Sequence, residues 1–285
     1  MYVVMGATGH VGAAVANALL AQGEPVTILT RRPEDAGSWR EKGASVAMAD
    51  AENVASLTAA FRQGKRAFLL NPPADPTGDT DATELRTVRN ILIALEGSNL
   101  EKVVAASTYG AQPGKAIGDL TTLWALEEGL RTRAIPTAVN RGAYYMSNWT
   151  GLANLVQQSG KLPSLFPADA LMPMVAPVDL GEAAASHLRA PAGATAVHHI
   201  EGPARYTPQD VANAFASALG REVIVEVVPR DQWEAVYKDW GFSDAAARAY
   251  VRMTEASLAD GFYKPDTPQR GRVTLQDFIA AAMKR

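Results

Sequence analysis

The chain has 285 residues with a formal net charge of −3, and 47% of the residues are hydrophobic while 20% are charged. This balance is typical of a globular protein with a sizeable core, and without a long basic run it gives no indication of nucleic-acid binding. Cysteine is absent, which excludes disulfides, thiol nucleophiles and cysteine-ligated metal centres.

The apolar runs are too short for a membrane partner, since none reaches the ~18 residues that a spanning helix needs. The first apolar stretch is not preceded by a basic segment, so it does not resemble a signal peptide. We therefore expect a cytoplasmic protein with no membrane partner. The sequence leaves the oligomeric state open.

A loop with regularly spaced glycines follows the first predicted strand, residues 2–5. It reads Gly6-Ala7-Thr8-Gly9-His10-Val11-Gly12, and apolar residues at helical spacing come after it up to Leu19, with Gly23 at the expected helix end. Glycine lets the backbone turn tightly and approach a pyrophosphate, and the free N–H groups of a helix start attract that anion. The strand–loop–helix context predicts a dinucleotide site, although glycine-rich turns also occur for packing alone.

The second predicted strand, residues 25–30, is followed by Arg31 and Arg32. An NAD-binding fold usually has Asp or Glu at this place, where the carboxylate holds the ribose 2′-hydroxyl. Arginine offers planar donors that suit a phosphate, so the pair favours NADP(H) over NAD(H). The alternative is that both arginines only solvate the end of a strand.

Strands and helices continue to alternate up to residue 140. The predicted strands are 44–49, 66–70, 102–106 and 136–140, and the predicted helices are 38–42, 54–63, 85–95 and 120–131, with a polar loop over 74–82. Repeated βα units predict a parallel sheet covered by helices, with ligands at the carboxyl ends of the strands. The residues expected at those ends, which would ring one crevice unless they are ordinary turn residues, are Asp50, Asn71, Pro72, Pro73 and Ser107.

The alternating pattern stops after Trp149. Helical segments, proline-containing loops and isolated short strands follow, among them a predicted amphipathic helix over 210–220 and a predicted strand over 223–228. Within this part, His198 and His199 are neighbours on a predicted strand, so their side chains point to opposite faces and do not predict a shared metal site.

Several segments together resemble the NmrA-like family of atypical short-chain dehydrogenases/reductases. They are the loop 6–12, the segment Arg31-Arg32-Pro33, residues 141–149, the stretch 178–184, and Glu201-Gly202-Pro203 with Thr207. Within 141–149, Gly142 stands where the family usually has proline. The resemblance implies a Rossmann-like doubly wound α/β fold with a smaller C-terminal lobe. It divides the chain into an NADP-binding domain, 1–150 with 174–203, and a substrate lobe, 151–173 with 204–285.

The resemblance also assigns residues to the two ends of the cofactor. Gly6, Thr8, Gly9, His10, Val11 and Gly12 match the pyrophosphate loop, and Arg31 with Arg32 matches the reader of the 2′-phosphate. Asp50 and Ala51 match the adenine contact, while Asn71 and Pro72 match a contact further along the cofactor. Tyr144, Tyr145 and Asn148 match the segment that lines the nicotinamide end and the cleft.

The catalytic apparatus of carbinol dehydrogenases is missing from the expected helix. Those enzymes use a tyrosine and a lysine four residues later, and the lysine lowers the pKa of the tyrosine. Residues 120–131 contain neither. Tyr109 and Lys115 lie six apart in a loop, where we expect surface residues, and Glu127 with Glu128 is expected on a solvated helix face.

Two functions remain. The first is an NADP(H)-dependent oxidoreductase that reduces a quinone-like or conjugated acceptor by direct hydride transfer, with protons from solvent, Tyr144 or Tyr145. The second is a non-catalytic NADP(H) sensor with a protein partner, and a reductase or isomerase of another small metabolite is a third, weaker alternative. Trp233, Tyr237 and Trp240 recur at helical spacing, as expected for core packing or for the wall of a flat substrate site.

Overall fold

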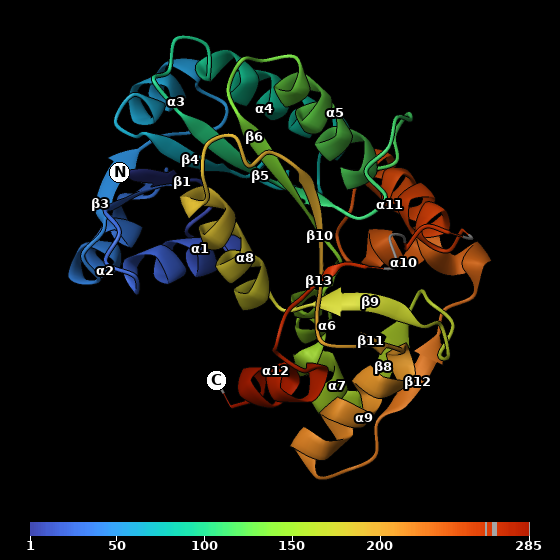
Figure 1. The fold of residues 1–285 in the computed structure, drawn as a ribbon. Helices are drawn as coiled ribbons and strands as arrows, with labels where there is room; N and C mark the ends of the chain where they lie inside the picture. Colours follow the sequence, from blue (N-terminus) through green and yellow to red (C-terminus); the bar gives the residue numbers. More distant parts are fainter. Residues whose placement is uncertain (260, 264–266, 285) are drawn as a thin grey trace.

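An eight-stranded parallel sheet forms the centre of the computed structural model, which describes residues 1–259, 261–263 and 267–284 (Figure 1). The strand order is β13-β10-β6-β5-β4-β1-β2-β3. The strands in chain order are β1 (Tyr2–Val4), β2 (Val26–Thr30), β3 (Ser45–Met48), β4 (Arg66–Leu69), β5 (Lys102–Thr108), β6 (Thr137–Gly142), β10 (Val197–Glu201) and β13 (Gln269–Arg270).

Helices cover both faces of this sheet, so its inner strands are buried on two sides and consist of nearly continuous apolar runs. One face packs on α1 (His10–Leu20), α2 (Ala36–Glu41) and α8 (Pro177–Arg189). The other face packs on α3 (Val54–Phe61), α4 (Thr80–Ala94) and α5 (Asp119–Arg131). This is the Rossmann-like α/β architecture that the sequence predicts.

The order of the strands changes direction between β1 and β4. From β1 the chain proceeds outward through β2 and β3, then crosses to β4 on the other side of β1 and continues to β5 and β6. Folds of this kind bind dinucleotides at the carboxyl ends of the strands beside this point. The predicted pyrophosphate loop lies there, between β1 and α1.

A second group of elements lies beside the sheet and has a core of its own (Figure 1). Two small sheets, β11-β9-β7 and β12-β8, belong to it. Its strands are β7 (Tyr144–Tyr145), β8 (Lys161–Ser164), β9 (Met172–Val175), β11 (Arg205–Tyr206) and β12 (Ile224–Val227), and its helices are α6 (Met146–Thr150), α7 (Ala153–Ser159), α9 (Pro208–Leu219), α10 (Trp233–Asp239), α11 (Asp244–Ser257) and α12 (Leu275–Ala282).

The chain passes between the two groups several times. After β9, helix α8 packs against α1 on the face of the large sheet, and β10 then pairs with β6. Near the C-terminus, β13 pairs with β10 before α12 joins the core that contains α9. The boundaries 1–150 with 174–203 and 151–173 with 204–285 stay a prediction, and the second range includes residues outside the described ones.

The boundaries of the early elements agree with the predicted ranges to within a few residues, with one larger difference. Helix α4 begins at Thr80, inside the segment that we expected to be a loop, because Asp79 caps it. The Asp79 carboxylate accepts a hydrogen bond from the backbone N–H of Ala82 (3.0 Å). No helix in the described part of the chain is both long and apolar enough to cross a membrane.

Candidate functional site

The three glycines of the loop after β1 have different roles. Gly6 adopts a positive φ of 68°, and its carbonyl accepts the N–H of Gly9 (2.9 Å), which closes the turn. At Gly12 a Cβ atom would lie 2.3 Å from the Gly6 carbonyl, so this glycine is required by close packing. At Gly9 a Cβ would meet only the Gly6 oxygen at 3.5 Å, so the space above Gly9 is open to a ligand.

Helix α1 begins directly at this open backbone. Gly9 is its N-cap residue and supplies no side-chain cap, so the N–H groups of the first turn keep their capacity to bind an anion. Thr8 and His10 are exposed beside them, whereas Val11 packs in the core. A ligand at this loop would meet the Val11 and Gly12 positions through the backbone.

The two arginines after β2 differ in their side-chain contacts. The Arg32 side chain donates to the Asp35 carboxylate (2.8 Å), which also accepts a hydrogen bond from the Thr30 hydroxyl. Arg31 is exposed, and within residues 1–259, 261–263 and 267–284 it forms no ion pair. Because β2 neighbours β1 in the sheet, Arg31 lies at the same edge as the glycine loop, on the side where the adenosine end of a dinucleotide would lie.

Asp50 and Ala51 follow β3 and are half-buried beside this edge. The Asp50 carboxylate accepts the backbone N–H of Glu52 (2.9 Å), and the Ala51 carbonyl accepts from the side chain of Asn90 (3.0 Å). Both residues are therefore held in place by local hydrogen bonds.

Asn71 and Ser107, at the ends of β4 and β5, are buried and use their polar atoms inside the protein. Asn71 donates to the Glu84 carbonyl (3.3 Å) and accepts from the Thr87 hydroxyl (2.7 Å). The Ser107 hydroxyl donates to the Glu127 carboxylate. Pro72 is half-buried and Pro73 exposed next to Asn71. A ligand along this edge would meet the backbone and the proline rings more readily than these polar groups.

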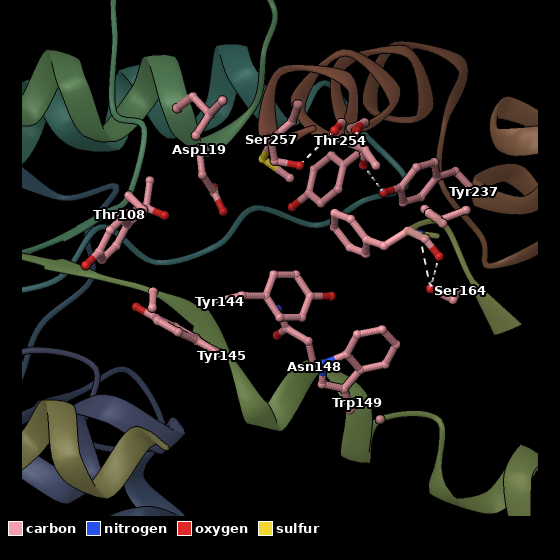
Figure 2. A pocket seen from close by; sticks show the side chains of 18 of the residues that line it. Thr108, Asp119, Tyr144, Tyr145, Asn148, Trp149, Ser164, Tyr237, Thr254 and Ser257 are labelled. Atoms are coloured by element: carbon pink, nitrogen blue, oxygen red, sulfur yellow. Dashed lines mark hydrogen bonds between the residues drawn. The ribbon is translucent and has the colours of Figure 1, made fainter. Parts of the chain in front are cut away.

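A cavity of about 550 Å³ opens beyond the carboxyl ends of β5 and β6. Tyr144, Tyr145 and Asn148 line it, as Figure 2 shows, together with residues of α5, α10 and α11. Most of its walls are apolar or aromatic. Its aromatic side chains include Tyr144, Tyr145, Trp149, Tyr237, Phe242 and Tyr250.

The tyrosines of this cavity are neutral hydroxyl donors. Burial raises the pKa of Tyr145 to about 12, with a further contribution from the charge of Asp119. Burial likewise raises the pKa of Tyr144, whose hydroxyl is hydrogen-bonded to the side chain of Asn148. These phenols can donate hydrogen bonds to a ligand near neutral pH but cannot serve there as bases.

One titratable group that the sequence analysis missed also lines the cavity. Among the described lining residues, Asp119 is the only Asp, Glu, Lys, Arg or His. It is the first residue of α5 and follows Gly118, whose positive φ of 57° turns the chain into the helix. No motif marks it, since a single Asp at a helix start is most often only a favourable charge for the helix dipole.

Two expectations about side-chain exposure were wrong. Tyr109 is buried, and its hydroxyl donates to the fully buried Glu201 (3.0 Å), whereas Lys115 is exposed as expected. Glu127 is also largely buried, because it forms an ion pair with Arg141. Glu128 does lie on the solvated face.

The aromatic residues at helical spacing contribute to a core and to the cavity, and a role as the wall of a flat substrate site stays a prediction. Trp233 packs in a small core with Leu165 and Ala247, and Tyr237 and Trp240 line the cavity. His198 and His199 lie on β10 and face different partners, since His198 stacks on His187 while His199 contacts the ring of Tyr109.

The chain therefore has the architecture of the α/β proteins that bind dinucleotides at the carboxyl edge of a parallel sheet. It belongs to the NmrA-like family, whose family model matches residues 2–256.

Two solved structures share this fold, and a further protein is similar in sequence. The NADPH-dependent quinone oxidoreductase of Escherichia coli, in complex with NADPH, is 19% identical, with a TM-score of 0.80 over 99% of each chain. The triphenylmethane reductase of Citrobacter sp., complexed with NADP(H), is 18% identical, with a TM-score of 0.81 over 99% of this chain and 100% of that one. An NAD(P)H azoreductase of Xenophilus azovorans is 20% identical over 249 residues, which are 87% of this chain and 84% of the relative.

Proposed function

We propose that this protein is an NADP(H)-dependent oxidoreductase that passes a hydride to a flat, conjugated acceptor such as a quinone. The observation that carries the proposal is the aromatic cavity beside an open glycine loop on one edge of the sheet. The similar proteins described above are reductases of quinones, triphenylmethane dyes and, by name, azo compounds, which are all conjugated acceptors.

The residues present fit a dinucleotide along this edge. The backbone at Gly9, which carries no side chain, and the uncapped start of α1 suit the pyrophosphate. Among the described residues, Arg31 forms no ion pair that would compete with a 2′-phosphate. We assign Asp50 and Ala51 to the adenosine end, and the backbone near Asn71, Pro72, Pro73 and Ser107 to the stretch that leads to the cavity. When bound, the reduced nicotinamide supplies the hydride.

The cavity suits a flat acceptor more than a small carbinol. Tyr144 packs edge-on against Phe166 (ring centroids 5.6 Å apart) and Tyr145 lies beside it on β7, so aromatic surfaces face the ligand space. The hydroxyls of Tyr144 and Tyr145 and the amide of Asn148 can orient carbonyl oxygens of the acceptor. With an electrophilic acceptor, the site needs chiefly to align the reactants and exclude water.

The alternative is a non-catalytic NADP(H) sensor that binds a protein partner. One experiment separates the two functions: the purified protein is mixed with NADPH or NADH and a panel of para-benzoquinone, an azo dye and a triphenylmethane dye, and nucleotide oxidation is recorded. We expect turnover with NADPH. The Gly9→Val variant, which should fold without binding nucleotide, is the control. Tight NADPH binding without turnover of any acceptor would instead favour the sensor.

A further inference from the structure

Asp119 lies where it can touch a ligand in the aromatic cavity. In Figure 2 its side chain extends from the start of α5 into the same space as Tyr144 and Tyr145, which project from the opposite wall. The carboxyl group is thus the single acidic group among the described lining residues of a cavity otherwise built of phenols, an amide, alcohols and apolar groups.

A second carboxyl group, that of Glu84 on α4, lies next to Asp119 and is only 3% exposed. The Glu84 carboxyl accepts the hydroxyl of Thr122 (2.9 Å) and the backbone N–H of Ala74 (3.1 Å), and its third contact is a hydrogen bond with the side chain of Asp119. Two carboxyl groups can hydrogen-bond to each other only if one of them carries a proton. The pair therefore holds a proton at the cavity wall.

The surroundings keep that proton bound. Burial, together with the neighbouring charge of Asp119, raises the pKa of Glu84 to about 8. Burial also raises the pKa of Asp119, but its hydrogen bond with Glu84 acts in the opposite direction, so the proton of the pair lies on Glu84, which donates it to the Asp119 carboxylate. The titratable groups that interact with the pair are Asp81 on α4, Tyr145 on β7 and Tyr250 on α11. Asp79 and the cation Arg252 act in turn on Asp81.

We propose that Asp119 passes the proton of this pair to a neutral acceptor when the acceptor accepts a hydride, and that Glu84 is the positioning residue that holds the proton next to Asp119. The inference rests on the proposed function. It replaces solvent, Tyr144 and Tyr145 as the immediate proton source, and the two tyrosines keep a role in orienting the acceptor.

Reduction of a quinone needs one hydride and one further proton. The hydride brings two electrons and one proton to the quinone, and the resulting anion takes a second proton from the pair through the Asp119 carboxyl to give the hydroquinone. The pair is left as two carboxylates and regains one proton from water that enters the cavity when the product leaves. A cationic triphenylmethane dye differs, because its carbocation takes the hydride alone and becomes a neutral product without any proton.

This difference gives a test within one active site. Turnover of para-benzoquinone and of crystal violet is compared in the parent protein and in Asp119→Asn. Loss of a positioned general acid costs about 100-fold or more, so the ratio of quinone to dye turnover should fall about 100-fold. Glu128→Gln, an exposed change on the same helix, should leave the ratio unchanged. A dye turnover that collapses while quinone turnover persists would overturn the proposal, since Asp119 would then act as a charge that binds the cation.

The role of Glu84 is tested through the pH profile. In the parent protein, quinone turnover should decrease as pH rises above about 8, because the shared proton is then lost. In Glu84→Gln the group with a pKa of about 8 is gone, so the decrease should move away from pH 8, while dye turnover keeps the same profile. A profile identical to that of the parent, in a variant with a parent-like melting temperature, would contradict the positioning role.

An infrared measurement needs neither cofactor nor acceptor. The free protein should show the carbonyl stretch of a protonated carboxyl group at neutral pH. This band should be lost in Glu84→Gln, which removes the group that carries the proton, and should shift in Asp119→Asn, which changes its hydrogen-bond partner, but should stay unchanged in Glu128→Gln. The absence of the band in the parent overturns the inference even if turnover is found. If the parent reduces no acceptor, the proposed function fails separately, whatever the band shows.

Discussion

Glu127 on α5 binds Arg141 on β6 at two points, with Nε donating to Oε1 (2.9 Å) and Nη2 to Oε2 (2.7 Å). The two side chains are 10% and 22% exposed. The Ser107 hydroxyl of β5 donates to the same carboxylate. This ion pair thus holds α5, the helix that begins with Asp119, against the carboxyl ends of the two strands beside the cavity.

Removal of Glu127 should destabilise the protein strongly. Glu127→Ala leaves the Arg141 charge without its partner in a largely buried place, so we expect the free energy of unfolding to fall by about 3 kcal/mol. Glu128→Ala is the matched control, since it breaks an exposed pair with Arg131 and should cost less than about 1 kcal/mol. Urea unfolding of both variants is the measurement, and equal losses would contradict the structural role of the pair.

This ion pair also illustrates what the sequence could and could not predict. The regular strands and helices up to β6 could be predicted because their apolar periodicity is local and the elements alternate. The burial of Glu127 could not, because its partners Ser107 and Arg141 approach it only when the strands and the helix pack together. Local spacing alone placed Glu127 with its neighbour on the solvated face.

In the candidate site, too, the sequence predicted contiguous motifs but not residues that meet only through packing. The glycine loop and Arg31 are visible in the sequence because each belongs to a contiguous motif. The pair of Glu84 and Asp119 is separated by 35 positions and meets only through the packing of α4 on α5. Beyond Trp149 the local patterns predicted α9 and β12 to within a few residues, but not the pairing of β12 with β8, which lies far away in the sequence.

The glycine loop can be tested at two positions with opposite expectations. Gly9→Val should fold, since φ at this position is −104° and a Cβ has room, but its side chain should block a pyrophosphate and abolish dinucleotide binding. Gly12→Ala should instead lower the melting temperature, because its Cβ would collide with the Gly6 carbonyl. Calorimetric titration and thermal melts check both. Tight NADPH binding by a folded Gly9→Val protein would show that the loop is only a turn.

Cofactor preference should depend more on Arg31 than on Arg32. Arg31→Asp replaces an attractive contact to the 2′-phosphate by a repulsive one, so NADPH binding should weaken by more than about tenfold while NADH binding changes little. Arg32→Ala should have a smaller effect, because Asp35 already holds that side chain. Dissociation constants for both nucleotides are measured for each variant. Equal constants for NADPH and NADH in the parent protein would refute the assignment of NADP.

Tyr109 should contribute to stability and not to proton transfer. It is 2% exposed and donates to Glu201, which also binds Arg205 and Arg270. Tyr109→Phe removes one hydrogen bond, so we expect a loss of about 1 kcal/mol and a change in turnover well under the ~100-fold of a lost general acid. Lys115→Ala, at an exposed position, should change neither quantity. A collapse of turnover in a folded Tyr109→Phe protein would restore a tyrosine acid.

The stacked pair of His187 on α8 and His198 on β10 should lower the stability of the protein in acid. His187 stacks on His198 with ring centroids 3.8 Å apart, and its Nδ1 donates to the side-chain oxygen of Asn140 (2.8 Å). Burial lowers the pKa of His187 to about 4, and the nearby charges of His198 and Lys102 act in the same direction. An unfolded histidine has a pKa near 6.5, so between these two values the unfolded chain binds the extra proton.

Stability should therefore be lost as pH falls from about 6.5 towards 4, by up to about 1.4 kcal/mol per pH unit for this one group. In His187→Gln this contribution is absent. The variant should be less stable than the parent near pH 8, because stacking is lost, and the difference should shrink as the pH drops below about 6.5. His10→Gln, at an exposed position of the glycine loop, is the control for the substitution itself. The free energy of unfolding is measured with urea across this pH range. If it depends on pH in the same way in the parent and in His187→Gln, then His187 binds its proton equally well in the folded and unfolded states.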